Sequence, residues 1–147
     1  MKKDWKLRHL AFVVKDIDNA LQYYESLGIV SAVGSERLME LSNKAKTKLR
    51  FVQIGSLVIV FFQPVEGESM HSDFLEKHGE GIQRIAFTVD DIDKEVDELV
   101  GRGVALMFRG DQPNGSRIAY FDTGKIGDVL MELVQPTGGV ETLINNQ

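Results

Sequence analysis

An internal repeat is the feature that most constrains how this chain can fold. Residues 8–29 align with residues 83–104 at a constant offset of 75, and seven of the 22 aligned positions are identical. The identical pairs are Ala11/Ala86, Phe12/Phe87, Val14/Val89, Asp16/Asp91, Ile17/Ile92, Asp18/Asp93 and Gly28/Gly103. A duplicated segment constrains the architecture more strongly than local propensities do, because both copies are expected to form the same supersecondary unit.

Each copy begins with a β-rich run, at residues 9–14 and 84–89, and continues into an Asp-Ile-Asp turn. Aspartate at such a turn favours a helix N-terminus, since its carboxylate accepts hydrogen bonds from the first free backbone N–H groups. An amphipathic helix is predicted after the turn in both copies. Gly28 and Gly103 end these helices, where a left-handed residue costs least.

Further β-like runs follow each helix. They lie at residues 49–54 and 57–62 in the first half and at 118–121 and 129–134 in the second, with weaker runs at 29–33 and 104–108. Both halves close on a Gln-Pro dipeptide, which is consistent with proline ending a strand. The sequence therefore predicts an α+β fold of two tandem βαβββ units.

The predicted domain is single and spans residues 1–147. Its repeats occupy residues 7–66 and 82–136, and a linker with a short helix around Asp73–Lys77 joins them at residues 67–81. His71 and His78 lie in this polar linker, so we expect both to be solvated surface histidines.

Composition excludes several classes of protein. The chain has no cysteine, which removes disulfides, thiolate nucleophiles and cysteine-based metal sites. Its net charge of −5 argues against nucleic-acid binding, because a binder of phosphates needs a basic surface. The longest strongly apolar run, residues 57–62, is far shorter than the roughly 20 residues that cross a bilayer. We therefore expect a cytoplasmic protein with neither nucleic-acid nor membrane partners.

Two strings in the second half carry a resemblance to a known family. Phe74-Leu-Glu-Lys-His-Gly-Glu-Gly-Ile82 precedes the strand from Arg84, and Ile118-Ala-Tyr-Phe precedes Gly127-Asp-Val-Leu-Met-Glu-Leu-Val-Gln-Pro136. With them, residues 7–136 resemble the vicinal-oxygen-chelate superfamily, which includes glyoxalase I (lactoylglutathione lyase), extradiol dioxygenases and bleomycin-resistance proteins. The resemblance is strongest to the methylmalonyl-CoA epimerases. It implies a glyoxalase-like fold, in which the two units curl their strands into a curved mixed sheet that forms a cup.

The resemblance also implies a divalent metal in the cup, with one ligand from the first strand and one from the last strand of each unit. His9 and Glu132 match the expected ligand types, whereas Arg84 and Val60 occupy the other two positions. A protonated guanidinium has no lone pair to give, and valine has no donor atom. Catalytic zinc normally takes three protein ligands. We therefore expect no cofactor, with a divalent metal (Co, Mn, Zn or Ni) at His9 and Glu132 as the alternative.

Glu132 lies within an apolar strand, where a carboxylate is costly to bury unless it is paired. The repeat places Arg84 across the cup, so a bidentate pair between Arg84 and Glu132 is predicted. This pair has two interpretations. It is either a structural ion pair that fills the metal site, or a replacement of the metal's charge in which Arg84 binds a substrate carboxylate or an enolate oxygen.

The site residues expected from this reasoning fall into two groups. Glu132 and His9 are the catalytic candidates, because either can move a proton. The substrate-binding candidates are Arg84, His9, Thr88 and Phe62, which period-two alternation places on the strand faces that line the cup. The rest of this wall is largely apolar, which suits a modest organic anion.

Two classes of function remain open from the sequence. The first is an isomerase or lyase of the methylmalonyl-CoA epimerase or glyoxalase I type, which acts on a small anionic metabolite or acyl thioester by proton transfer next to a carbonyl. The alternative is a metal-free protein of the bleomycin-resistance type that binds or sequesters a small molecule. The resemblance implies a homodimer in both cases.

Overall fold

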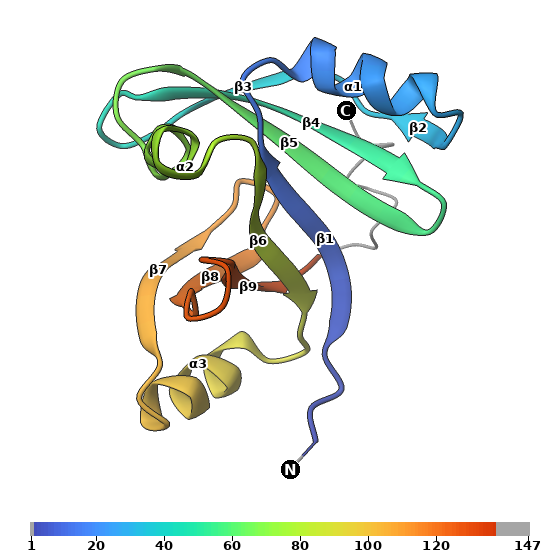
Figure 1. Ribbon diagram of the computed structural model, residues 1–147. Helices are drawn as coiled ribbons and strands as arrows, with labels where there is room; N and C mark the ends of the chain where they lie inside the picture. Colours follow the sequence, from blue (N-terminus) through green and yellow to red (C-terminus); the bar gives the residue numbers. More distant parts are fainter. Residues whose placement is uncertain (1, 138–147) are drawn as a thin grey trace. The chain divides into compact units, whose positions relative to one another are not determined.

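The computed structural model describes residues 2–137 and divides the chain into two compact units (Figure 1). The N-terminal unit is Leu10–Gln83. The C-terminal unit combines residues 2–9 with residues 84–137 of the described chain. The chain passes from one unit to the other inside β1 (Lys6–Val13) and again inside β6 (Gly81–Thr88).

The N-terminal unit contains a mixed sheet. Its strands are β2 (Val30–Val33), β3 (Arg37–Glu40), β4 (Lys46–Ile54) and β5 (Leu57–Glu66), together with the last residues of β1. Strand β5 is parallel to β1 and antiparallel to β4, and β4 also pairs antiparallel with β2 and β3. Helix α1 (Ile17–Ser26) packs on one face of this sheet through Ile17 and Leu21. On the other face, Phe74 and Leu75 of α2 (Met70–His78) pack on a second apolar cluster.

The C-terminal unit repeats this plan. Strands β6, β9 (Leu130–Gln135), β8 (Arg117–Asp122) and β7 (Ala105–Asp111) follow one another across the sheet. The β6–β9 pairing is parallel and the other two pairings are antiparallel. Helix α3 (Ile92–Gly101) covers one face through Ile92 and Val96, which contact Phe121 and Leu133. Because side chains alternate along a strand, Arg84, Ala86 and Glu132 belong to the opposite face.

The repeated Asp-Ile-Asp and Gln-Pro motifs have a shared structural reason. Asp16 caps α1 by accepting a hydrogen bond from the backbone N–H of Asn19 at 3.0 Å, and Asp91 caps α3 in the same way. The glutamine of each Gln-Pro pair accepts a further bond from the first helical N–H. Gln63 bonds Ile17 at 2.9 Å, and Gln135 bonds Ile92 at 3.0 Å. In each half the last strand therefore ties down the N-terminus of the helix.

The structure confirms the predicted α+β class, and residues 81–135 follow the order β, α, β, β, β. The weak runs near residues 29–33 and 104–108 are strands β2 and β7. The first half differs by the additional short strand β3, which pairs with β4 across a turn that includes Lys44 at a φ of 72°. Helix α2 is longer than predicted, because Ser69 begins it with a capping box. Within residues 2–137, no helix is long and apolar enough to span a bilayer.

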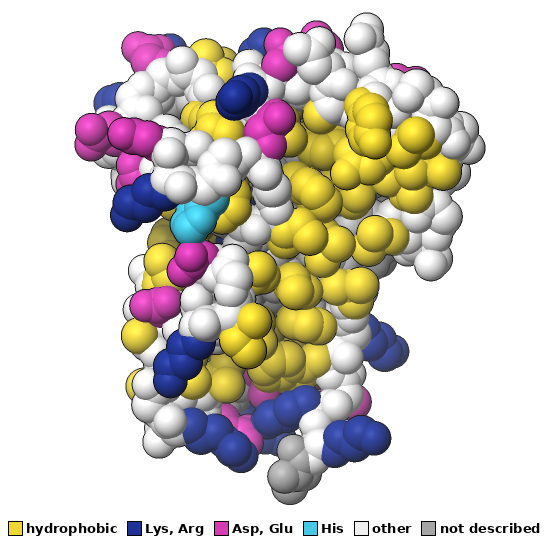
Figure 2. Space-filling model, in the orientation of Figure 1, with side chains coloured by type: hydrophobic (Ala, Val, Ile, Leu, Met, Phe, Trp, Pro, Cys, Tyr) yellow, Lys and Arg dark blue, Asp and Glu magenta, His cyan; other side chains and the backbone are white. Residues whose placement is uncertain are grey.

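Both units expose apolar side chains as well as burying them. In the N-terminal unit, Figure 2 shows a broad group of apolar atoms in the region of β2, β4 and β5. The large apolar residues exposed in this unit include Tyr23, Leu27, Ile29 and Val33. In the C-terminal unit, Leu106, Met107 and Phe108 of the edge strand β7 are exposed.

Candidate functional site

A buried ion pair lies on the face of the C-terminal unit's sheet opposite the face that α3 covers. The β6–β9 register places Ala86 opposite Glu132, so Arg84 and Glu132 share one face of adjacent parallel strands. Arg84 Nε donates a hydrogen bond of 2.9 Å to Glu132 Oε1. Arg84 is 1% exposed and Glu132 is 5% exposed. The ion pair predicted from the repeat is therefore confirmed with Nε as the donor, whereas its bidentate geometry stays a prediction.

Tyr120 forms the third member of this cluster. In the β8–β9 register it lies directly opposite Glu132, and its ring centroid is 4.7 Å from Cζ of Arg84. Burial raises the pKa of Tyr120 to about 12, so the phenol stays protonated at neutral pH. Sequence reasoning missed this residue. Pairing residues 118–121 against 129–134 in an antiparallel register would have placed it on the face of Glu132.

Arg84 stays protonated despite its burial. Burial alone lowers the pKa of a guanidinium, but the nearby Tyr120 and Glu132 and the hydrogen bond to Glu132 outweigh it, so the pKa of Arg84 is raised. A buried cation must be paired in this way, because an uncompensated charge in a low-dielectric interior costs several kcal/mol (about 3–5 in mutational studies). The site therefore holds a permanent positive charge beside a carboxylate.

His9 lies at the edge of the same cluster. Its Nε2 is 3.9 Å from Glu132 Oε1, and the side chain is buried. Burial lowers the pKa of His9 to about 4, although the nearby Glu132 opposes this shift. The imidazole is consequently neutral at pH 7, and its approach to Glu132 is not a charged pair there. A neutral imidazole can accept a proton, but one with so low a pKa is a weak base.

The donor set around Glu132 does not fit an ordinary metal centre. Among residues 2–137, no three His, Cys, Asp or Glu side chains come together as a group that could hold a metal ion. His9 and Glu132 supply one donor side chain each, and Glu132 is already bound by a cation, Arg84. Val60 is fully buried in an apolar cluster of the N-terminal unit, with Val13 and Phe62 among its members.

The other predicted site residues have different surroundings. Thr88 is half-buried on β6, opposite Val134 of β9. Phe62 belongs to the N-terminal unit, where it is 8% exposed and stacks on His71 with ring centroids 4.5 Å apart and planes 8° from parallel. The expectation that His71 is a surface histidine is wrong. It is 3% exposed, and its Nδ1 is 3.3 Å from Thr47 Oγ1. His78 is exposed, as expected.

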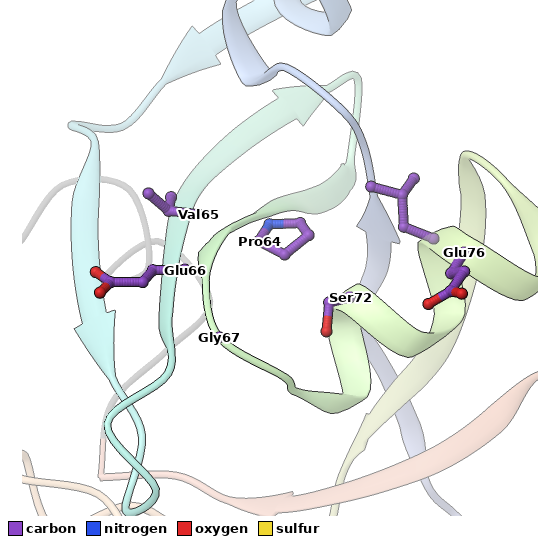
Figure 3. A pocket seen from close by; sticks show the side chains of 7 residues that line it. Pro64, Val65, Glu66, Gly67, Ser72 and Glu76 are labelled. Atoms are coloured by element: carbon purple, nitrogen blue, oxygen red, sulfur yellow. The ribbon is translucent and has the colours of Figure 1, made fainter.

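The N-terminal unit also contains a cavity of about 340 Å³ between the end of β5 and α2 (Figure 3). Its lining residues are Pro64, Val65, Glu66, Gly67, Ser72, Leu75 and Glu76. None of them is a predicted site residue, and Glu66 and Glu76 are exposed to solvent. A buried charge cluster is the better marker of function, because desolvation strengthens its interaction with a ligand. The cluster of Arg84, Glu132, Tyr120 and His9 is therefore the candidate site.

Comparison with known proteins identifies relatives along most of the chain. Residues 8–121 match the sequence profile of the Glyoxalase/Bleomycin resistance protein/Dioxygenase superfamily. The uncharacterized protein YqjC of Bacillus subtilis (strain 168) is 29% identical over 135 residues, which cover 90% of this chain and 94% of that protein.

Solved structures with the same fold support the match. A hypothetical protein from Bacillus halodurans C-125 has a TM-score of 0.74 and 26% identity, and the alignment covers 92% of this chain and 97% of the other. Methylmalonyl-CoA epimerase from Mycobacterium tuberculosis also has a TM-score of 0.74, with 27% identity and 94% of both chains covered. The predicted glyoxalase-like fold is therefore confirmed.

Proposed function

This chain belongs to the Glyoxalase/Bleomycin resistance protein/Dioxygenase superfamily, and on that premise we propose that it binds a small organic anion or acyl thioester beside Arg84 and transfers a proton next to the ligand's carbonyl group. The observation that carries the proposal is the buried pair of Arg84 and Glu132. The similarity to a methylmalonyl-CoA epimerase supports an isomerase or lyase of that general type.

Arg84 supplies the binding charge in this proposal. A guanidinium has five N–H donors, and the bond from Nε to Glu132 uses one of them. Guanidinium N–H groups bind carboxylates through parallel hydrogen bonds and stabilise an oxyanion that forms when a proton leaves the neighbouring carbon, and Arg84 serves these roles in the proposal. The fixed positive charge thus takes the place that the family resemblance assigns to a metal ion.

The proton acceptors in the proposal are Glu132 and His9. Both lie within the cluster, and the neutral imidazole of His9 has one unprotonated ring nitrogen at pH 7. A guanidinium polarises a carbonyl less strongly than a divalent ion does, so we expect slow turnover that does not depend on added metal.

Deuterium uptake tests the reaction. The chain is treated with a chelator and incubated with methylmalonyl-CoA in D₂O, with and without added cobalt or manganese. We expect the α-carbon to take up label without metal, and Arg84→Leu to abolish the uptake. Arg102→Leu is the matched control, because it removes an exposed arginine whose partner is Glu98. Uptake equal to that of buffer in every sample would rule out this activity.

Binding without turnover is the second candidate function. It is favoured by the low pKa of His9, which makes its imidazole a weak base, and by the engagement of Glu132 with Arg84. A protein of this type sequesters its ligand, as bleomycin-resistance proteins of the family do. Calorimetric titration with methylmalonyl-CoA then gives a saturable heat in the absence of label uptake.

Arg84→Lys separates a ligand-binding arginine from a purely structural one. Lysine keeps the charge but lacks the planar fork that makes parallel hydrogen bonds. If Arg84 binds the ligand, this variant should bind methylmalonyl-CoA more weakly than wild-type protein does, although its stability is only slightly lower. Unchanged affinity would show that the pair is structural only.

We propose in addition that the protein acts as a homodimer in the cytoplasm.

A further inference from the structure

We propose that Tyr120 is the positioning residue of this site, and that its aromatic face holds the guanidinium of Arg84 in the orientation that recognises a planar anion. The inference rests on the proposed function for its ligand, but its structural basis is independent of any ligand. Tyr120 lies outside the set of residues that the sequence suggested. It acts through Arg84 rather than through the reacting atoms.

The guanidinium of Arg84 is held from two directions. Its Nε edge donates to Glu132 Oε1 at 2.9 Å, and its Cζ lies 4.7 Å from the centroid of the Tyr120 ring. The electron-rich face of an aromatic ring attracts a cation within about 6 Å, and the attraction is larger where water is excluded. With Arg84 only 1% exposed, water competes little with this contact.

The Tyr120 ring is itself fixed by the next strand. Phe108 of β7 contacts it with ring centroids 5.4 Å apart and an interplanar angle of 42°. The Phe108 ring in turn lies against the backbone at Gly110, where an added Cβ would stand 2.8 Å from Phe108 Cζ. Phe108, Tyr120, Arg84 and Glu132 thus form one contiguous stack across the sheet of the C-terminal unit.

A stack of this kind affects binding through preorganisation. A free arginine side chain loses much rotamer freedom when it binds an anion, and that loss weakens affinity. Glu132 fixes one edge of the guanidinium, while Tyr120 fixes its plane. The guanidinium then meets a carboxylate or enolate without further ordering. Loss of the ring face should therefore weaken anion binding while the charge of Arg84 remains.

The test changes the electron density on the face of the ring at position 120 while keeping the shape of the ring. Tyr120→Phe retains the attractive face, whereas pentafluorophenylalanine in place of Tyr120 has nearly the same shape but an electron-poor face that no longer attracts a cation. Two properties are measured in each protein. One is the NMR signal of Arg84 Hε with its rate of exchange with water, and the other is the affinity for methylmalonyl-CoA by calorimetry.

We expect Tyr120→Phe to keep slow Hε exchange and wild-type affinity. The fluorinated protein should show faster Hε exchange and an affinity that is lower by about 3- to 30-fold, the range of a partly to fully desolvated cation–π contact. Arg37, whose Cζ lies 5.4 Å from the Phe51 ring in the other unit, is the internal control, and its signal should not change. If the Tyr120 ring only fills space, fluorination should leave both the Hε exchange rate and the affinity unchanged.

Failure of this inference is distinguishable from failure of the proposed function. If the fluorinated protein retains slow Arg84 Hε exchange, Tyr120 does not position the guanidinium and the inference is overturned, whatever the ligand results are. If wild-type protein does not bind methylmalonyl-CoA while fluorination still speeds Hε exchange, Tyr120 positions Arg84, and it is the ligand class that is wrong. Tyr120→Leu, which removes the ring, provides a second comparison of the exchange rate.

Discussion

At the residue scale, the buried charge of Arg84 has the largest energetic consequence. Arg84→Ala leaves Glu132 buried beside a neutral side chain, so we expect the free energy of unfolding to fall by about 3–5 kcal/mol. Urea denaturation measures this loss. Replacing both residues together, with Arg84→Met and Glu132→Leu, should recover much of it, since no unpaired charge remains. Arg102→Ala, an exposed control, should change stability by less than about 0.5 kcal/mol.

His9 makes stability depend on pH. Burial lowers its pKa from 6.5 to about 4, so the unfolded chain takes up a proton at a pH where the folded chain does not. The contribution of His9 to stability is therefore fully present above pH 6.5 and is lost as the pH falls to about 4. The size of the loss is roughly 3 kcal/mol, from the free energy of proton uptake across that interval.

The measurement compares wild-type protein with His9→Leu by urea denaturation at several pH values. As the pH is lowered from 6.5 to about 4, the unfolding free energy of wild-type protein should fall relative to that of His9→Leu. His78→Leu is the matched control, because that histidine is exposed. A difference that stays constant from pH 7 to pH 4 would mean that the pKa of His9 is the same in the folded and the unfolded chain.

Arg84 also determines whether the site can take a metal. Arg84→His removes the competing cation and adds an imidazole next to His9 and Glu132, which gives the three donors that catalytic zinc normally has. We expect this variant to bind zinc or cobalt more tightly than wild-type protein in isothermal titration. Arg84→Leu removes the cation without adding a donor and should gain much less. Equal affinity in all three proteins would show that these positions do not form a metal site.

At the element scale, one glutamine hydrogen bond in each half joins the last strand of that half to the N-terminus of its helix. Gln63→Ala removes the acceptor for the N–H of Ile17, and Gln135→Ala does the same for Ile92. Each change should lower the free energy of unfolding by about 1 kcal/mol, the net value of an ordinary hydrogen bond. Gln53→Ala, which loses an exposed bond to Gly55, should cost less. Thermal denaturation that ranks Gln53→Ala as the most damaging would contradict this reading.

The elements themselves were largely predictable from the repeat. The Asp-Ile-Asp turns and the glycines at 28 and 103 predicted α1 and α3, because capping is a local interaction within a few residues. Strand β3 was not predicted. Residues 37–40 form a run of only four, in which Leu38 and Met39 are flanked by charged residues, and they pair as a strand with β4. Such pairing depends on a partner and leaves a weak signal in the sequence.

At the scale of the whole molecule, we predict a homodimer. The exposed apolar residues of the edge strand β7 provide a surface that a second copy could cover. Sedimentation analysis at micromolar concentration should give twice the 16.5 kDa mass of the chain. Met107→Lys places a charge on this strand and should weaken the dimer, whereas Lys125→Glu changes a turn outside the strand and is the control. A monomer mass for wild-type protein would contradict the prediction.

The sequence by itself determined the α+β class, the capped starts of α1 and α3, and the pairing of Arg84 with Glu132. These follow from local periodicity and from a repeat that assigns equivalent positions to equivalent strands. Only the tertiary structure decided that Tyr120 lies against Arg84, that His71 is buried against Phe62, and that His9 is neutral. Each of these depends on strand register or on burial by residues distant in the chain. Contacts of that kind arise from packing, which the order of residues along one strand does not specify.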